Sequence, residues 1–231
     1  MIVPIRELIE RADSSTGIDA ERAEDAIRRL LRTYQRSLQR DRRVLLEEFL
    51  YLDLAHKVVG VGSVGTRCWI VLLAGRDNDD PLFMQVKEAQ RSVLEPVLSD
   101  SRFTNHGQRV VEGQRLMQAV GDIFLGWGRW GTLDDGVGDC YVRQLWDWKS
   151  SLKLEAILPR GLIAYALACG WTLARAHARS GDRIAIASYL GTRDTFERAI
   201  AEFAQAYADL NEHDHQALAE AARAGRITVK L

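Results

Sequence analysis

A glycine-rich run in the first third of the chain has the composition of a phosphate-binding loop. Gly60, Gly62 and Gly65 form the pattern G-x-G-x-x-G, and Ser63 lies within it. Glycines leave room for backbone N–H groups to approach a phosphate, and several unrelated sites use this pattern. The residues that follow, 66–73, are β-branched, aromatic and apolar, which predicts a strand. The glycines are therefore expected in a hairpin, whereas a dinucleotide-binding turn requires a helix directly after Gly65.

Lys87 is expected on the third strand, counted from the strand that precedes the glycines. The chain has only five lysines, so a lysine in an otherwise apolar strand indicates a specific role. Alternation puts Phe83, Gln85 and Lys87 on one face of that strand. A buried ammonium is costly unless it meets a carboxylate or a phosphate. Glu112 and Glu95 are the candidate carboxylates, and Glu112 is preferred because its helix leads directly into the next strand. The alternative is a lysine that reaches solvent at a sheet edge.

A glycine-rich hairpin followed by a third strand that carries a lysine is the arrangement with which protein kinases cover nucleotide phosphates. ATP is therefore the expected ligand. The backbone N–H groups of Gly60 to Gly65 would approach the phosphates, Lys87 would contact the α- and β-phosphates, and Glu112 would orient Lys87. The competing hypothesis is a non-catalytic binding or interaction module, in which the glycines serve only a tight hairpin and Lys87 is structural.

Five segments with strand composition predict an antiparallel sheet. They are residues 56–62, 67–74, 82–89, 122–127 and 140–148, rich in Val, Ile, Leu, Trp and Phe. The polar connection 75–81 is too short to hide a crossover helix, so its flanking strands are expected to pair antiparallel. The connection between the last two strands contains four glycines and is expected to be a flexible loop.

Helical periodicity dominates the two ends of the chain. Apolar residues recur at three- and four-residue steps over 19–40, and Ala-rich helices are expected over 159–180 and 195–225. A further helical stretch, 90–120, is expected to break near Asn105. The prediction is an α+β protein with three parts. These are an N-terminal helical segment (1–55), a glycine-loop antiparallel sheet lobe (56–150) and a C-terminal helical region (151–231).

The charge balance excludes a general attraction to polyanions. The chain has 31 basic and 32 acidic residues, and its formal net charge is -1. Arg28, Arg32, Arg36 and Arg40 form a stripe on the first helix, but nearby acidic residues offset it, so we expect a solvated face and no nucleic-acid partner. No apolar run approaches the roughly 20 residues of a spanning helix. No membrane interaction is predicted, and the expected location is the cytoplasm.

Cysteine and histidine do not form a metal motif. Cys68, Cys140 and Cys169 are far apart and lack the spacing of a zinc site, so they are expected to be free thiols. His213 and His215 would point in different directions on a helix, because residues two apart do not share a face. No metal site is predicted from these residues.

Several longer runs of the sequence closely resemble a bacterial family. They are residues 56–67, 81–89, 105–115, 122–127, 141–145, 170–182 and 207–209. The family is called domain of unknown function 2252, and it is regarded as related to the protein-kinase-like fold. The resemblance covers nearly the whole chain in the family's order and implies a sheet that is similar to the nucleotide-binding lobe of kinases.

The resemblance also implies what this chain lacks. Full-length members are longer and carry, ahead of this region, a Gly-Asp-Ala-His-type catalytic-loop motif and an Asp-Phe-Asp-type metal motif. Neither motif occurs in the 231 residues. The chain thus resembles the C-terminal half of such a protein, a phosphotransferase fragment whose catalytic residues are unassigned. Mg²⁺ would bind only if a missing segment or a protein partner supplied its ligands. The missing half would also leave apolar surface, which self-association would cover. Gln85 departs from the small residue that kinases place against adenine.

Overall fold

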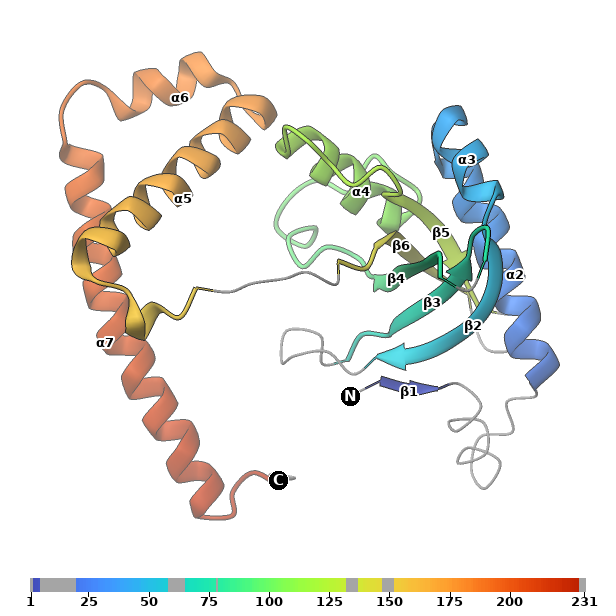
Figure 1. Cartoon of the computed structure of the whole chain (residues 1–231). Helices are drawn as coiled ribbons and strands as arrows, with labels where there is room; N and C mark the ends of the chain where they lie inside the picture. The colour runs from blue at the N-terminus through green and yellow to red at the C-terminus, as the bar shows by residue number, and fades with distance from the viewer. Residues whose placement is uncertain are drawn as a thin grey trace. The chain divides into compact units, whose positions relative to one another are not determined.

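The structure is a computed structural model that describes residues 2–4, 20–57, 65–77, 79–131, 137–146 and 152–228. It is an α+β fold in which the chain forms two compact units, residues 1–176 and 177–231 (Figure 1). The first unit contains an antiparallel sheet with helices packed on it. The second contains helices.

The sheet has six strands in the order β1-β2-β3-β4-β6-β5, and all neighbours pair antiparallel. The strands are β1 (Ile2–Pro4), β2 (Leu50–Lys57), β3 (Cys68–Ala74), β4 (Pro81–Ala89), β5 (Gly126–Trp130) and β6 (Gly138–Gln144). The five predicted strands correspond to β2–β6, and β1 adds a short sixth strand at one edge. The predicted antiparallel pairing is therefore confirmed.

The starts of two strands lie more than two residues from the prediction, and two ends also differ, since β5 ends at Trp130 rather than 127 and β6 at Gln144 rather than 148. β2 begins at Leu50 rather than His56, inside the segment expected to be helical. The sequence pattern does not reveal this start, because the apolar run before it continues the pattern of the preceding helix. β5 begins at Gly126 rather than at residue 122, because Asp122 starts a turn in which its side chain accepts a hydrogen bond from the N–H of Phe124 at 2.8 Å. Sequence periodicity alone does not reveal that turn.

The helices are α2 (Ala20–Ser37), α3 (Arg40–Glu47), α4 (His106–Met117), α5 (Pro159–Ser180), α6 (Arg183–Leu190) and α7 (Thr195–Arg223), with a 3-10 turn at Leu154–Ala156. The expected helices at 19–40, 159–180 and 195–225 are confirmed. The helix expected over 90–120 is wrong in its first half, where turns and bends replace it. There, the Ser92 and Ser101 hydroxyls accept hydrogen bonds from nearby N–H groups at 3.3 and 3.2 Å, which competes with helix formation.

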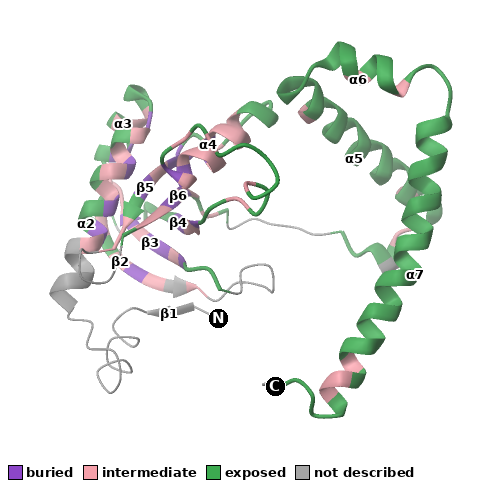
Figure 2. Cartoon of the chain, turned by 180° about the vertical axis from the view of Figure 1, so that it is seen from behind, coloured by how far each residue is buried: buried purple, intermediate pink, exposed green. Residues whose placement is uncertain are grey.

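The hydrophobic core lies between α2 and one face of the sheet (Figure 2). Its largest fully buried side chains include Tyr34 of α2 and Met84 of β4, both with no exposed surface. The Tyr34 hydroxyl donates a hydrogen bond to the Phe124 carbonyl at 2.6 Å, which connects α2 to the turn before β5. Trp69 and Trp130 contact at 5.6 Å between ring centroids although two strands separate them in the sheet order, so the sheet curves around this core.

Glycines in β5 explain how closely α2 approaches the sheet. A Cβ at Gly126 would collide with Ser37 of α2, and a Cβ at Gly128 would crowd Thr33 of the same helix. Those two hydroxyls accept hydrogen bonds from the N–H groups of Trp127 at 2.8 Å and of Arg129 at 3.2 Å. β5 is an edge strand, so α2 satisfies backbone donors that would otherwise be unpaired.

Replacing Tyr34 by Phe tests this connection. Tyr34→Phe removes the donor and leaves the buried Phe124 carbonyl unsatisfied, so we expect the free energy of unfolding to fall by about 1 kcal/mol. Urea denaturation of the wild-type and variant proteins measures it. Tyr189→Phe is the matched control, because Tyr189 is 81% exposed and its hydroxyl can bond to water. Equal effects of the two substitutions would contradict the structural role of Tyr34.

Candidate functional site

The glycine-rich segment joins two paired strands. Residues 58–64, which include Gly60, Gly62 and Ser63, lie outside the described residues. Strand β2 ends before this segment and β3 begins at Cys68 after it, and the two strands pair antiparallel. A strand therefore follows Gly65 where a dinucleotide-binding turn requires a helix, so the glycine pattern does not form such a turn.

Gly65 and its neighbours are bonded to the end of β4. Gly65 has a φ of +81°, a conformation that side chains other than hydrogen disfavour. Its carbonyl accepts a hydrogen bond from Gln90 Nε2 at 3.5 Å. The backbone N–H of Arg67 donates to Glu88 Oε2 at 3.0 Å, and the N–H of Glu88 donates to the Arg67 carbonyl at 2.9 Å. The glycine-rich connection therefore leads into β3 next to the end of β4 on which Lys87 lies.

Lys87 is half-buried on β4, a strand in the interior of the sheet. It lies opposite Cys68 of β3 on one side and opposite Tyr141 of β6 on the other. Directly opposed residues share a face of the sheet, so these three side chains belong to one face. The alternative placement of Lys87 at a sheet edge is wrong, because β4 lies between β3 and β6.

Gln85 is 3% exposed on the same face, two residues before Lys87. Its Nε2 donates a hydrogen bond to Cys68 Sγ at 3.5 Å, and its Oε1 accepts from both Nε and Nη2 of Arg143 at 3.3 Å. Arg143 lies opposite Gln85 across the β4–β6 pair. Spacing along the chain does not identify Arg143 or Cys68 as site residues, because only the pairing register brings them beside Gln85 and Lys87.

Burial raises the pKa of the Cys68 thiol, and this effect outweighs the surrounding charges. In decreasing order, the charge of Lys87, the hydrogen bond from Gln85, the charge of Lys57 and the charge of Arg143 all lower it. Burial likewise raises the pKa of Tyr141 against the opposing charge of Arg143. We call this face of the sheet, which carries Lys57, Cys68, Gln85, Lys87, Tyr141 and Arg143, the lysine face.

Helix α4 packs on the lysine face. The Arg115 guanidinium of α4 lies 5.6 Å from the centroid of the Trp127 ring, and Trp127 is opposite Tyr141. The start of α4 is held by Asp139, whose carboxylate accepts from Asn105 Nδ2 and from the N–H of His106, both at 2.7 Å. The Asn105 side chain caps the helix by accepting from the N–H of Gln108 at 2.9 Å.

Glu112 is half-buried on α4 and forms an ion pair with Arg115, with 3.3 Å between Oε1 and Nη1. Arg115 also donates to the Leu125 carbonyl at 2.7 Å, which fixes its position. Glu95, the alternative carboxylate, pairs with Arg91 at 2.6 Å, and this hydrogen bond lowers the pKa of Glu95. The contact of Glu112 with Lys87 stays a prediction, and Arg115 would compete for it.

Within the described residues, no three His, Cys, Asp or Glu side chains gather in a way that could hold a metal ion. All three cysteines are free thiols, as predicted, although Cys169 is exposed whereas Cys68 and Cys140 are buried. Among the helices in the described part of the chain, none is both long and apolar enough to cross a membrane.

Residues 5–221 match the model of a family described as "Uncharacterized protein conserved in bacteria (DUF2252)". The chain belongs to this family. None of the curated proteins and none of the solved structures matches the chain. Membership in DUF2252 confirms the family expected from the sequence. The function of the lysine face is therefore inferred from its own geometry.

The docking of α4 depends on Gly107, and a second glycine of the same helix provides the control. A Cβ at Gly107 would collide with the Cys140 carbonyl of β6, whereas a Cβ at Gly113 would meet nothing within 4 Å. Gly107→Ala should lower the free energy of unfolding by about 1 to 3 kcal/mol. Gly113→Ala should raise it by up to about 1 kcal/mol, because alanine favours helix. Urea denaturation measures both, and a neutral Gly107→Ala would contradict the close approach of α4 to β6.

Proposed function

We propose that this chain is a nucleotide-binding lobe that holds the phosphates of ATP and is not catalytically complete alone. The observation that carries the proposal is the position of Lys87. It is half-buried on an interior strand, at the end of the sheet where the glycine-rich connection between β2 and β3 begins and ends. A lysine at this position can reach phosphates that backbone N–H groups of the same connection bind.

The order of the elements supports the same function. The glycine connection, the lysine strand β4 and helix α4 with Glu112 follow one another along the chain, and protein kinases arrange their phosphate-binding parts in this order. In this proposal Gly60, Gly62, Ser63 and Gly65 surround the phosphates. Lys87 contacts the α- and β-phosphates, and Glu112 orients Lys87.

The proposal assigns no catalytic base and no metal ligand to this chain. Phosphoryl transfer in kinases requires Mg²⁺ held by carboxylate or amide side chains and a base for the attacking hydroxyl. In the described part of the chain no group of three potential metal-ligating side chains meets the first requirement. Mg²⁺ and the base would come from another segment or from a partner chain. The proposal includes the cytoplasmic location that the sequence predicts.

The test is calorimetric titration of the chain with ATP, with and without Mg²⁺. We expect saturable binding, and we expect Lys87→Ala to weaken it by at least about tenfold, because a charge-assisted contact with phosphate is lost. Lys153→Ala is the matched control, since Lys153 is exposed and lies outside the sheet. Absence of binding at millimolar ATP, in protein shown to be folded, would exclude the nucleotide-binding lobe.

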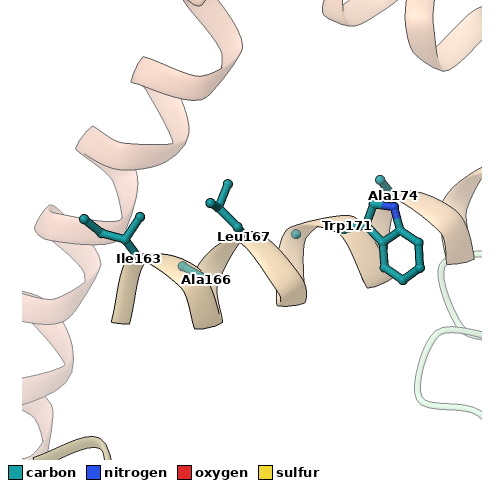
Figure 3. A pocket seen from close by; sticks show the side chains of 6 residues that line it. Ile163, Ala166, Leu167, Trp171 and Ala174 are labelled. Atoms are coloured by element: carbon teal, nitrogen blue, oxygen red, sulfur yellow. The ribbon is translucent and has the colours of Figure 1, made fainter. Parts of the chain in front are cut away.

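A second candidate function is a non-catalytic interaction module that self-associates through the C-terminal helices. None of the described residues of α5, α6 and α7 is buried (Figure 2). Trp171 is 62% exposed, and it lines a shallow apolar pocket on α5 with Ile163, Ala166, Leu167, Gly170 and Ala174 (Figure 3). Helices that expose this much apolar surface are normally covered by another helix.

Charge favours a second copy of the chain as the partner. Helix α5 carries three arginines and no acidic residue, whereas α7 carries six acidic residues and two arginines. Phe196, Ile200, Phe203, Tyr207 and Leu210 form an exposed stripe on α7 with the alternating four- and three-residue spacing of a helix-packing seam. The acidic, apolar α7 of one copy would therefore fit the basic, apolar α5 of another.

Light scattering after size-exclusion chromatography tests this self-association. We expect the wild-type chain to have the mass of a dimer and Trp171→Asp to have the mass of a monomer, because the substitution puts a negative charge opposite the acidic α7. The control is Val93→Asp, since Val93 is 89% exposed but lies outside the C-terminal helices. A wild-type chain that stays monomeric at every concentration would rule out the second copy as the partner.

A further inference from the structure

The lysine face carries two further cations besides Lys87. Lys57 on β2 belongs to this face, because Ala55 lies opposite Ile70 and residues two apart on a strand point the same way. Lys87 and Arg143 complete a set of three cations from three strands. Each of the three acts on the same buried thiol, that of Cys68. The pairing register places Lys87 and Arg143 on adjacent strands of the same face.

Arg143 is oriented by a neutral partner. Two N–H groups of its guanidinium, from Nε and Nη2, converge on Gln85 Oε1 at 3.3 Å, and Gln85 is itself fixed by its hydrogen bond to Cys68 Sγ. A guanidinium has five N–H donors, so three of them are not used by Gln85. An amide also leaves the charge of the arginine uncompensated. The planar group is thus held on one side and can donate on the other.

The carboxylate of Glu112 on α4 has a cation of its own helix as its partner. Glu112 is paired with Arg115 at 3.3 Å, so the charges of these two residues offset each other. A guanidinium that is held by a neutral amide is stabilised by a ligand that carries negative charge. Phosphate groups satisfy this requirement, and their oxygens match the fork of an arginine.

We infer that Arg143, aimed by Gln85, is a second phosphate-binding residue beside Lys87 on the lysine face. This assignment rests on the proposed nucleotide-binding function and extends it. Arg143 contacts the phosphate chain directly, and Gln85 acts through Arg143 as a positioning residue. It also explains why a buried glutamine occupies the position where kinases have a small side chain.

The experiment is calorimetric titration with ATP and, separately, with inorganic tripolyphosphate. Arg143→Ala should weaken the binding of both ligands by about tenfold, and Arg143→Lys by about threefold, since it keeps the charge but loses the fork. Gln85→Leu should also weaken both. The double variant should bind no more weakly than Arg143→Ala, because Gln85 has no effect once the guanidinium is absent. Arg76→Ala is the control, since Arg76 is exposed beyond the far end of β3.

The outcomes separate this inference from the proposed function. Wild-type affinity of Arg143→Ala, together with weak binding by Lys87→Ala, would overturn the role of Arg143 and leave the nucleotide-binding lobe intact. Binding of tripolyphosphate that depends on Arg143, without binding of ATP, would overturn the nucleotide function and support the phosphate site. No binding of either ligand by the folded wild-type chain would overturn both. If Arg143→Ala does not fold, Arg143→Lys decides, and an unchanged affinity of that variant contradicts the inference.

Discussion

The close approach of α2 to strand β5 is the contact on which the rest of the sheet depends. β5 is an edge strand, and its glycines let the hydroxyls of Ser37 and Thr33 reach its backbone N–H groups. Helix α2 therefore buries the core face and satisfies the edge at once, so the opposite face of the sheet is free to hold polar residues. Without α2, both faces of the sheet would be exposed to water, and the lysine face would have no hydrophobic core behind it.

Asp139 plays the corresponding part on the lysine face. Its carboxylate accepts hydrogen bonds from Asn105 and from the N–H of His106, and it lies 3.4 Å from the guanidinium of Arg129. One residue of β6 thus determines where α4, the helix that carries Glu112, begins. β4 precedes α4 in the chain and β5 follows it, and both strands pair with β6. The start of α4 is consequently fixed by the sheet, not by a loop.

Sequence patterns predicted the parts of this fold that depend on local periodicity. The antiparallel strands around Lys87, the long helices and the strand after Gly65 follow from alternation, helical spacing and residue type. The patterns failed where tertiary contacts decide. Gly128 resembles part of a loop unless the helix that packs on it is known, and residues 90–105 have helical composition but bond to their own serines. Arg143 was missed for a related reason, because its partner Gln85 lies 58 positions away in sequence.

The two candidate functions use different physical features of the chain. The lysine face is built by β2, β3, β4 and β6 with α4 packed on it, and its chemistry is positive charge beside buried neutral groups. The C-terminal helices expose apolar side chains and opposite net charges on α5 and α7, and their chemistry is that of helix packing. Salt weakens the attraction of a phosphate to exposed cations but strengthens or leaves unchanged the burial of apolar surface. Ligand binding and self-association should therefore respond differently to ionic strength, which makes the two activities separable in one preparation of the protein.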